Sequence, residues 1–204
     1  MSAAIIPFNP LDKLNLGASV ADALLAQPAV PLGELDRFLG AGVYALYYGG
    51  KFKPYAVLAR RSSPEEIGVP IYVGKAVPAG ARKGGRIDPN PGTVLYNRLS
   101  EHAETIRAAN NLEIKDFHCR YLVVDDIWIP LGESLLIARF SPLWNSLIDG
   151  FGNHDPGSGR YNGMRPRWDI LHPGRAWAMK CKPRKESERD IERDVESFLA
   201  NYSD

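Results

Sequence analysis

Two short runs of β-branched and aromatic residues constrain the fold of this chain most strongly. The first covers residues 42–48 (Gly-Val-Tyr-Ala-Leu-Tyr-Tyr), and the second covers residues 71–75 (Ile-Tyr-Val-Gly-Lys). Glycine or proline bounds each run, which is typical of β-strands. If the strands are adjacent, the phenols of Tyr44 and Tyr72 lie together beside the bare backbone of Gly74, where a substrate could approach. Tyrosines in strands are more often packing residues, so this pattern alone does not establish a site.

A helix predicted at residues 93–109 carries the next candidate site residues. Thr93 stands where an N-cap is expected, and the apolar stripe consists of Leu95, Leu99, Ala103 and Ile106. Arg98 and His102 are four residues apart, so their side chains project together from another face of this helix. The two groups repel each other mildly when both are charged. An anion between them would explain the arrangement, although an exposed helix face also tolerates it.

A lone carboxylate occurs on a second predicted helix. Residues 116–124 have the pattern of a strand, and residues 129–140 have the pattern of a helix. Glu133 lies on that helix among leucine and isoleucine, and a carboxylate is costly to bury there unless a cation meets it. Two interpretations therefore stay open, a metal ligand or a side chain that faces solvent. Asn145 follows the helix closely.

These residues together resemble the GIY-YIG nuclease motif, over roughly residues 41–147. Gly-Val-Tyr precedes Tyr-Val-Gly, and an arginine, a histidine, a glutamate and an asparagine follow in the family's order. The resemblance implies a catalytic site formed by Tyr44, Tyr72, Lys75, Arg98, His102, Glu133 and Asn145. It also implies one Mg²⁺ bound by Glu133, with Mn²⁺ as a substitute. The family usually joins the two tyrosine strands by a short hairpin, so residues 49–68 must be an insertion here.

The expected fold class is α/β in the α+β sense: a small, mainly antiparallel β-sheet flanked by helices. We expect a single domain over residues 1–204, with a helical arm at 1–40, the catalytic core at 41–147 and a loop-rich, DNA-contacting extension at 148–204. Apolar spacing predicts helices at residues 19–26 and 31–39, a strand at 55–59 inside the insertion, and a C-terminal helix from about residue 185. The stripe of that last helix consists of Ile191, Val195, Phe198 and Leu199.

The distribution of charge favours a polyanionic partner, although the net charge is only +1. Residues 150–185 hold eight Lys or Arg against two Asp, whereas residues 186–204 hold seven acids against two Arg. Salt screens charges beyond about 10 Å, so DNA would respond to the local excess. Arginines also decorate loops for solubility, and the basic loop at residues 76–86 could be a plain linker. The candidate DNA-binding residues are Arg82, Lys83, Arg86, Asn153, His154, Arg160, Arg165 and Arg167.

The expected location is the cytoplasm. No apolar run is long enough to cross a bilayer, and residues 1–7 lack the basic start and apolar stretch of a signal peptide. Cys119 and Cys181 form neither a zinc-like spacing nor a disulfide framework, which agrees with a reducing compartment.

Within the nuclease family, the chain resembles type II restriction endonucleases, including those that cut CCGCGG. The similarity rests on the histidine after the arginine, on Tyr-Val-Gly-Lys-Ala-Val-Pro at residues 72–78, and on residues 149–157 and 172–175. It implies a Mg²⁺-dependent, site-specific endodeoxyribonuclease that acts on double-stranded DNA at a short palindromic G/C-rich site. A palindrome with one active site per chain implies a homodimer whose subunits each cut one strand.

Several alternatives stay open. A non-cleaving or non-specific DNA-binding protein could share the scaffold, and a small-molecule hydrolase is disfavoured because no phosphate-cradling glycine motif or nucleophile elbow occurs. The general base could be Tyr44 or His102. A phenol with a pKa near its usual value of about 10 is a poor base, so Tyr44 would need its pKa lowered.

Overall fold

A computed structural model of the protein describes residues 9, 11–60, 68–78, 91–157, 161–200 and 202. Within these residues the strands form one antiparallel sheet in the order β1-β4-β2-β3. The strands are β1 (Val30–Pro31), β2 (Gly42–Tyr48), β3 (Tyr72–Ala76) and β4 (Phe117–Val123). The α-helices are α1 (Lys13–Leu25), α2 (Ala56–Arg60), α3 (Val94–Ala108), α4 (Ile129–Phe140), α5 (Leu143–Ser146), α6 (Arg167–Leu171) and α7 (Glu188–Ala200). Short 3-10 helices are η1 (Leu32–Glu34), η2 (Lys53–Tyr55), η4 (Ile114–Asp116) and η5 (Ala178–Lys180).

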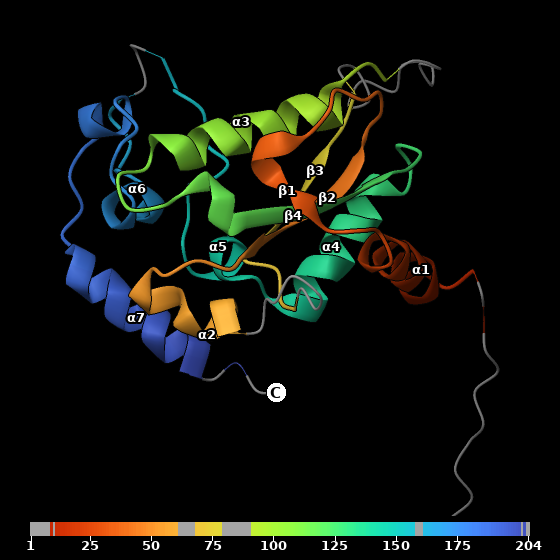
Figure 1. Cartoon of the computed structure of the whole chain (residues 1–204), viewed down its shortest axis with the longest axis horizontal. Helices are drawn as coiled ribbons and strands as arrows, with labels where there is room; N and C mark the ends of the chain where they lie inside the picture. The colour runs from red at the N-terminus through yellow and green to blue at the C-terminus, as the bar shows by residue number, and fades with distance from the viewer. Residues whose placement is uncertain are drawn as a thin grey trace, which may run out of the picture.

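Strand β2 lies in the middle of three layers, with every one of its residues buried. One set of alternating side chains packs with α3 and the C-terminal extension, and consists of Tyr44, Leu46 and Tyr48. The other set packs with α1 and α4, and consists of Val43, Ala45 and Tyr47. Figure 1 shows α3 on one side of the sheet and α4 on the other. Because helices cover both faces, β2 is apolar throughout instead of alternating with polar residues. This confirms the predicted α+β fold.

The outer strand β3 pairs directly with β2, so the two tyrosine strands are neighbours despite the insertion between them. The other edge of β3 is covered by α5, because the Trp144 backbone N–H donates to the Ile71 carbonyl at 2.9 Å. The Asn145 side chain accepts from the Val73 N–H at 2.8 Å and donates to the Val73 carbonyl at 2.9 Å. Covering an edge in this way prevents pairing with a further strand.

Two local predictions were wrong. The strand predicted at residues 55–59 is helical, as η2 and α2, because its apolar residues Tyr55 and Leu58 are buried beside α7 rather than paired in the sheet. Figure 1 shows α2 and α7 side by side. The helix predicted at residues 31–39 is η1 followed by extended chain. Its Phe38 ring stacks on Tyr121 at 4.4 Å instead of joining a helical stripe, so tertiary packing overrode local spacing.

The other elements follow their predicted positions closely. Helices α3, α4 and α7 and strands β2, β3 and β4 all occur where the spacing predicted them, and α1 begins earlier than expected. Thr93 precedes α3, but its hydroxyl donates to Asn97 Oδ1 at 3.2 Å and caps no backbone N–H. The extension is ordered in its described parts and places Phe151, Trp168 and Leu171 in the core. No helix among the described ranges is both long and apolar enough to cross a membrane.

Candidate active site

The site begins with a hydrogen bond between β2 and α3. The Tyr44 hydroxyl lies 2.6 Å from Nε2 of His102, and both side chains are buried. The ring of Tyr72 on β3 lies near both, with its centroid 6.3 Å from Tyr44 and 5.4 Å from His102. The sheet register and the buried stripe of α3 therefore bring together three of the residues that the sequence indicated.

Gly74 is required by this arrangement for a reason different from the one expected. It pairs with Tyr44 across the strands, and the Tyr44 ring lies over it. A Cβ atom at position 74 would stand 2.3 Å from the Tyr44 hydroxyl and 2.5 Å from Cζ. The space above Gly74 thus holds the tyrosine itself, and the prediction that substrate approaches the backbone there was wrong.

Arg98 lies beside the two phenols and is held by the extension. Its Nη2 donates to the Gly152 carbonyl at 2.9 Å, and its Nη1 contacts His154 Nε2 at 2.6 Å and Glu101 at 3.0 Å. For the arginine to donate to His154, that imidazole must present its unprotonated nitrogen. The guanidinium is close enough to lower the pKa of both Tyr44 and Tyr72, against the larger opposing effect of burial.

The protonation states of the buried pair follow from its surroundings. Burial, and secondarily Tyr72, raises the pKa of Tyr44 well above its usual value. Burial, and secondarily the positive charge of Arg98, lowers the pKa of His102 well below its usual value. At neutral pH a neutral phenol therefore meets a neutral imidazole. In the protein alone nothing lowers the pKa of Tyr44 enough to make it the base, which favours His102 as the final proton acceptor.

Glu133 and Lys75 form an ion pair of 2.6 Å beside this cluster, with side chains that are 20% and 33% exposed. Lys75 pairs with Val43 across the strands, so it faces the α4 side of the sheet, whereas Tyr44 and Tyr72 face α3. The two sides meet at the edge strand β3. Glu133 also contributes to raising the pKa of both phenols, which places its charge within electrostatic reach of them. The acid therefore lies on the opposite face of the sheet from the paired rings, near the edge strand β3 and within electrostatic reach of both phenols.

The donor set suits a hard cation that keeps most of its water. Among the described residues, no three His, Cys, Asp or Glu side chains gather as a metal-binding group. A single partly exposed carboxylate matches Mg²⁺, which usually binds through one or two carboxylates, water and substrate phosphate. Glu133 already attracts one cation, the ammonium of Lys75.

Asn145 does not reach into the cluster. Both polar atoms of its side chain bond to the backbone of Val73, between Tyr72 and Gly74. These two bonds fix the strand that carries Tyr72 and Lys75, and the orienting role of Asn145 in the site stays a prediction.

The predicted DNA-binding residues fall into three groups. Asn153 and His154 are exposed beside Arg98, so they border the site. Arg165 is half-buried and donates to the backbone carbonyls of Ala178 and Met179 at 3.0 and 3.3 Å. Arg82, Lys83, Arg86 and Arg160 lie outside the described residues.

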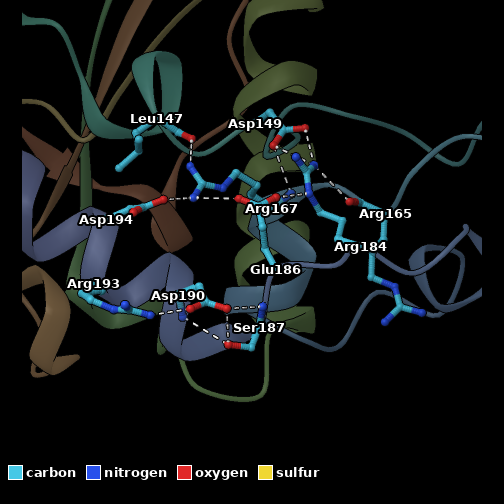
Figure 2. A network of polar contacts seen from close by, with 10 residues as sticks. All are labelled: Leu147, Asp149, Arg165, Arg167, Arg184, Glu186, Ser187, Asp190, Arg193 and Asp194. Atoms are coloured by element: carbon cyan, nitrogen blue, oxygen red, sulfur yellow. Dashed lines mark hydrogen bonds and ion pairs between the residues drawn. The ribbon is translucent and has the colours of Figure 1, made fainter.

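Arg167 was wrongly assigned to DNA binding. Its side chain is buried and forms ion pairs with Asp194 of α7 and with Glu186 at 3.1 Å, and it also donates to the Leu147 carbonyl. Figure 2 shows these contacts, with Arg184 bridging Asp149 and Glu186 nearby. Two arginines of the basic stretch, Arg167 and Arg184, therefore pair with acids of the acidic end of the chain, and Arg167 attaches α7 to the core. We remove Arg167 from the candidate DNA-binding residues.

The sequence reasoning missed two residues of the loop after Asp149. The Phe151 ring stacks on His102 at 4.6 Å and 15°, and it meets Tyr72 edge-on at 5.0 Å. A Cβ at Gly152 would lie 2.9 Å from Nη2 of Arg98 and 3.0 Å from the Tyr72 hydroxyl. Residues 149–157 contributed to the resemblance to restriction endonucleases, but they have no periodicity and could not be linked to α3 without the fold.

The structure combines a sheet that carries two tyrosines, a helix that carries an arginine and a histidine, and one carboxylate at the sheet edge. These features together define a nuclease of the GIY-YIG class. A family profile described as the Eco29kI GIY-YIG domain matches residues 36–199. The chain therefore belongs to this family of GIY-YIG type II restriction endonucleases, whose members are DNA-binding endonucleases. No curated protein matches the chain significantly.

Proposed function

We propose that the protein is a Mg²⁺-dependent type II restriction endonuclease that hydrolyses double-stranded DNA at a short palindromic G/C-rich site, with one metal ion per active site. The observation that carries this proposal is the hydrogen bond between Tyr44 and His102, with Arg98 and Glu133 within electrostatic reach of the same phenol. A protein that only bound DNA would have no need for a buried proton relay beside a single carboxylate.

In the proposed reaction, a water attacks the phosphorus and the bond to the departing oxygen breaks. The water gives its proton to Tyr44, which passes its own proton to Nε2 of His102 across the 2.6 Å contact. His102 is suited to accept because burial keeps it neutral. The planar guanidinium of Arg98 can neutralise the charge that grows on the phosphate oxygens.

Glu133 would hold the metal ion, and Mg²⁺ would supply charge neutralisation at the phosphate and at the departing oxygen. Mn²⁺ is expected to substitute because it has similar oxygen chemistry. In the protein alone, Lys75 occupies Glu133. With a divalent cation held by Glu133, the Lys75 ammonium would be free to contact a phosphate oxygen, while Asn145 keeps the strand in position.

The described residues form one such cluster per chain, so we expect two chains to cooperate in cleaving both strands. A homodimer with twofold symmetry would place one site on each strand of a palindrome. Eco29kI, after which the matching family is named, cuts CCGCGG. We propose a G/C-rich site of this kind here. The exposed Asn153 and His154 are suitable to contact DNA next to Arg98.

Digestion of plasmid DNA tests this function. We expect purified protein with Mg²⁺ to give discrete fragments that EDTA abolishes, and mapping their ends gives the recognition sequence. A smear would indicate a non-specific nuclease. A mobility shift without cutting would support the alternative, a DNA-binding protein that keeps the GIY-YIG scaffold.

A further inference from the structure

A buried arginine outside the catalytic cluster has all five of its N–H groups bonded. Nε and Nη2 of Arg175 donate to the two carboxylate oxygens of Asp169, each at 2.6 Å. Nη1 donates to the carbonyls of Phe151 and Asn153 at 3.2 and 3.0 Å, and Nη2 donates to that of Gly150 at 2.9 Å. A guanidinium is the only side chain with five donors in one rigid plane, so no other residue can reproduce this set of bonds.

Two indole rings hold the plane of this guanidinium. Its central carbon lies 4.6 Å from the centre of the Trp168 ring and 4.7 Å from that of Trp177. Arg175 is 6% exposed and Asp169 is 3% exposed, so water does not weaken these contacts. The arginine is therefore fixed in position as well as in charge.

The loop that Arg175 binds is the loop that contacts the catalytic cluster. The carbonyls of Gly150, Phe151 and Asn153 point to Arg175, and the remaining one, of Gly152, accepts from Arg98. Phe151 stacks on His102, and His154 contacts Nη1 of Arg98. The loop is thus held between Arg175, which is buried in the protein, and Arg98, which lies in the candidate site.

We propose that Arg175, fixed by Asp169, is a positioning residue that sets the loop of residues 150–154 against Arg98 and His102. The inference rests on the proposed nuclease function for its kinetic consequences, but the geometry it describes can be measured without cleavage. Without the clamp, the Gly152 carbonyl no longer fixes the Arg98 fork, and Phe151 no longer shields His102 from water.

The test substitutes Arg175→Lys, which keeps the charge but offers three donors in place of five. We expect kcat for DNA cleavage to fall about 10- to 100-fold, because displacing catalytic groups by about 1 Å costs that much. KM for DNA should rise as well, because the loop that Arg175 holds carries Asn153 and His154, which we propose contact DNA. Arg167→Lys is the matched control, because Arg167 is also buried and ion-paired in the extension but contacts no residue of the 150–154 loop.

A second measurement follows the pKa of His102 directly. NMR titration of labelled histidines should show the His102 pKa rising toward its usual value of about 6.5 in Arg175→Lys, since water reaches the ring. His102 should titrate as in the wild type in Arg167→Lys. If Arg175→Lys does not fold, Asp169→Glu, which moves the carboxylate by one methylene, is judged on the same measurements.

A kcat and a His102 titration that match those of the Arg167→Lys control would overturn the positioning role. A wild-type protein that cuts no DNA would instead refute the nuclease function, and the His102 titration would still decide whether Arg175 positions the loop. The two failures are therefore distinguishable.

Discussion

The hydroxyl of Tyr44 and Nε2 of His102 lie 2.6 Å apart in the interior, joining the central strand to helix α3. Burial raises the pKa of the phenol and lowers that of the imidazole, so both groups are neutral before reaction. A proton can then move from a water through the phenol to the imidazole without the prior formation of a phenolate. In the mechanism that we propose, this contact joins the phenol and the imidazole into one proton relay.

Removing either end of the relay should stop cleavage. We expect Tyr44→Phe and His102→Ala each to lower the single-turnover rate by about 10²- to 10⁴-fold, the usual contribution of general-base catalysis. The double variant should be little worse than the slower single variant, because the two groups act as a unit.

Tyr55→Phe is the matched control for this experiment. Tyr55 makes an equally short buried contact to His172, at 2.6 Å, outside the catalytic cluster. Its loss should lower stability while leaving cleavage near the wild-type rate. Wild-type rates in both Tyr44→Phe and His102→Ala would end the relay mechanism.

The pH dependence of cleavage should reflect a depressed histidine. His102 must be neutral to accept a proton, and burial, with Arg98, His154 and Arg175 nearby, lowers its pKa well below the usual value. The acid limb of the rate profile, measured at saturating Mg²⁺, should therefore lie well below pH 6.5. A limb centred at or above pH 6.5 would contradict this assignment.

Stability should fall as the pH drops below about 6.5. Burial lowers the pKa of His172 from its usual value to about 3 in the folded protein. Between these two pH values the unfolded chain binds a proton at this residue that the folded protein does not bind. The free energy of unfolding contributed by His172 is thus fully present above pH 6.5 and is lost as the pH falls toward 3.

Urea unfolding at a series of pH values measures this effect. A histidine whose pKa is lowered by folding adds up to about 1.4 kcal/mol per pH unit to the slope of the free energy of unfolding against pH in that range. His172→Gln should show a shallower slope than the wild type. An unchanged slope in His172→Gln would count against the neutral buried state.

Gly74 should tolerate no side chain. In Gly74→Ala the new methyl group would stand 2.3 Å from the Tyr44 hydroxyl, so the ring must leave its position beside His102. We expect a loss of about 1–3 kcal/mol in the free energy of unfolding, typical of overpacking, together with a loss of cleavage as severe as in Tyr44→Phe. Gly157→Ala, where a φ of 83° strains an alanine but nothing lies within 4 Å of the new methyl group, controls for a loss of stability that does not displace Tyr44. Wild-type cleavage by Gly74→Ala would show that the ring position does not matter.

The sequence was sufficient for the parts of the fold that rest on strong local patterns. Strand β2 and helix α4 combine regular spacing with clear ends, and both occur where they were predicted. The secondary structure around Tyr55 and Phe38 was predicted wrongly. The conformation of these segments depends on packing partners that are distant in sequence, such as Tyr121 for Phe38. Local spacing does not contain that information.

The residues of the candidate site likewise divide into those that the sequence could predict and those that it could not. Tyr44, Tyr72, Arg98 and His102 could be named from a motif, and the register and helix face then brought them together. The clamp formed by Asp169, Arg175 and the loop after Asp149 could not be found, because it joins segments without periodicity through backbone carbonyls. Arg167 was misassigned for a related reason, since a count of charges does not show which arginines are paired inside the protein.

The proposed mechanism depends most on one carboxylate, Glu133, which would hold the metal ion beside the relay and Arg98. The most direct measurement is single-turnover cleavage of a duplex containing the mapped site, in Mg²⁺, by wild-type protein and by Glu133→Gln, with DNA binding measured separately in EDTA. We predict that Glu133→Gln binds the duplex like the wild type but cuts it at least about 10³-fold more slowly, since metal-assisted charge stabilisation is lost. Cleavage by Glu133→Gln at the wild-type rate would contradict the account.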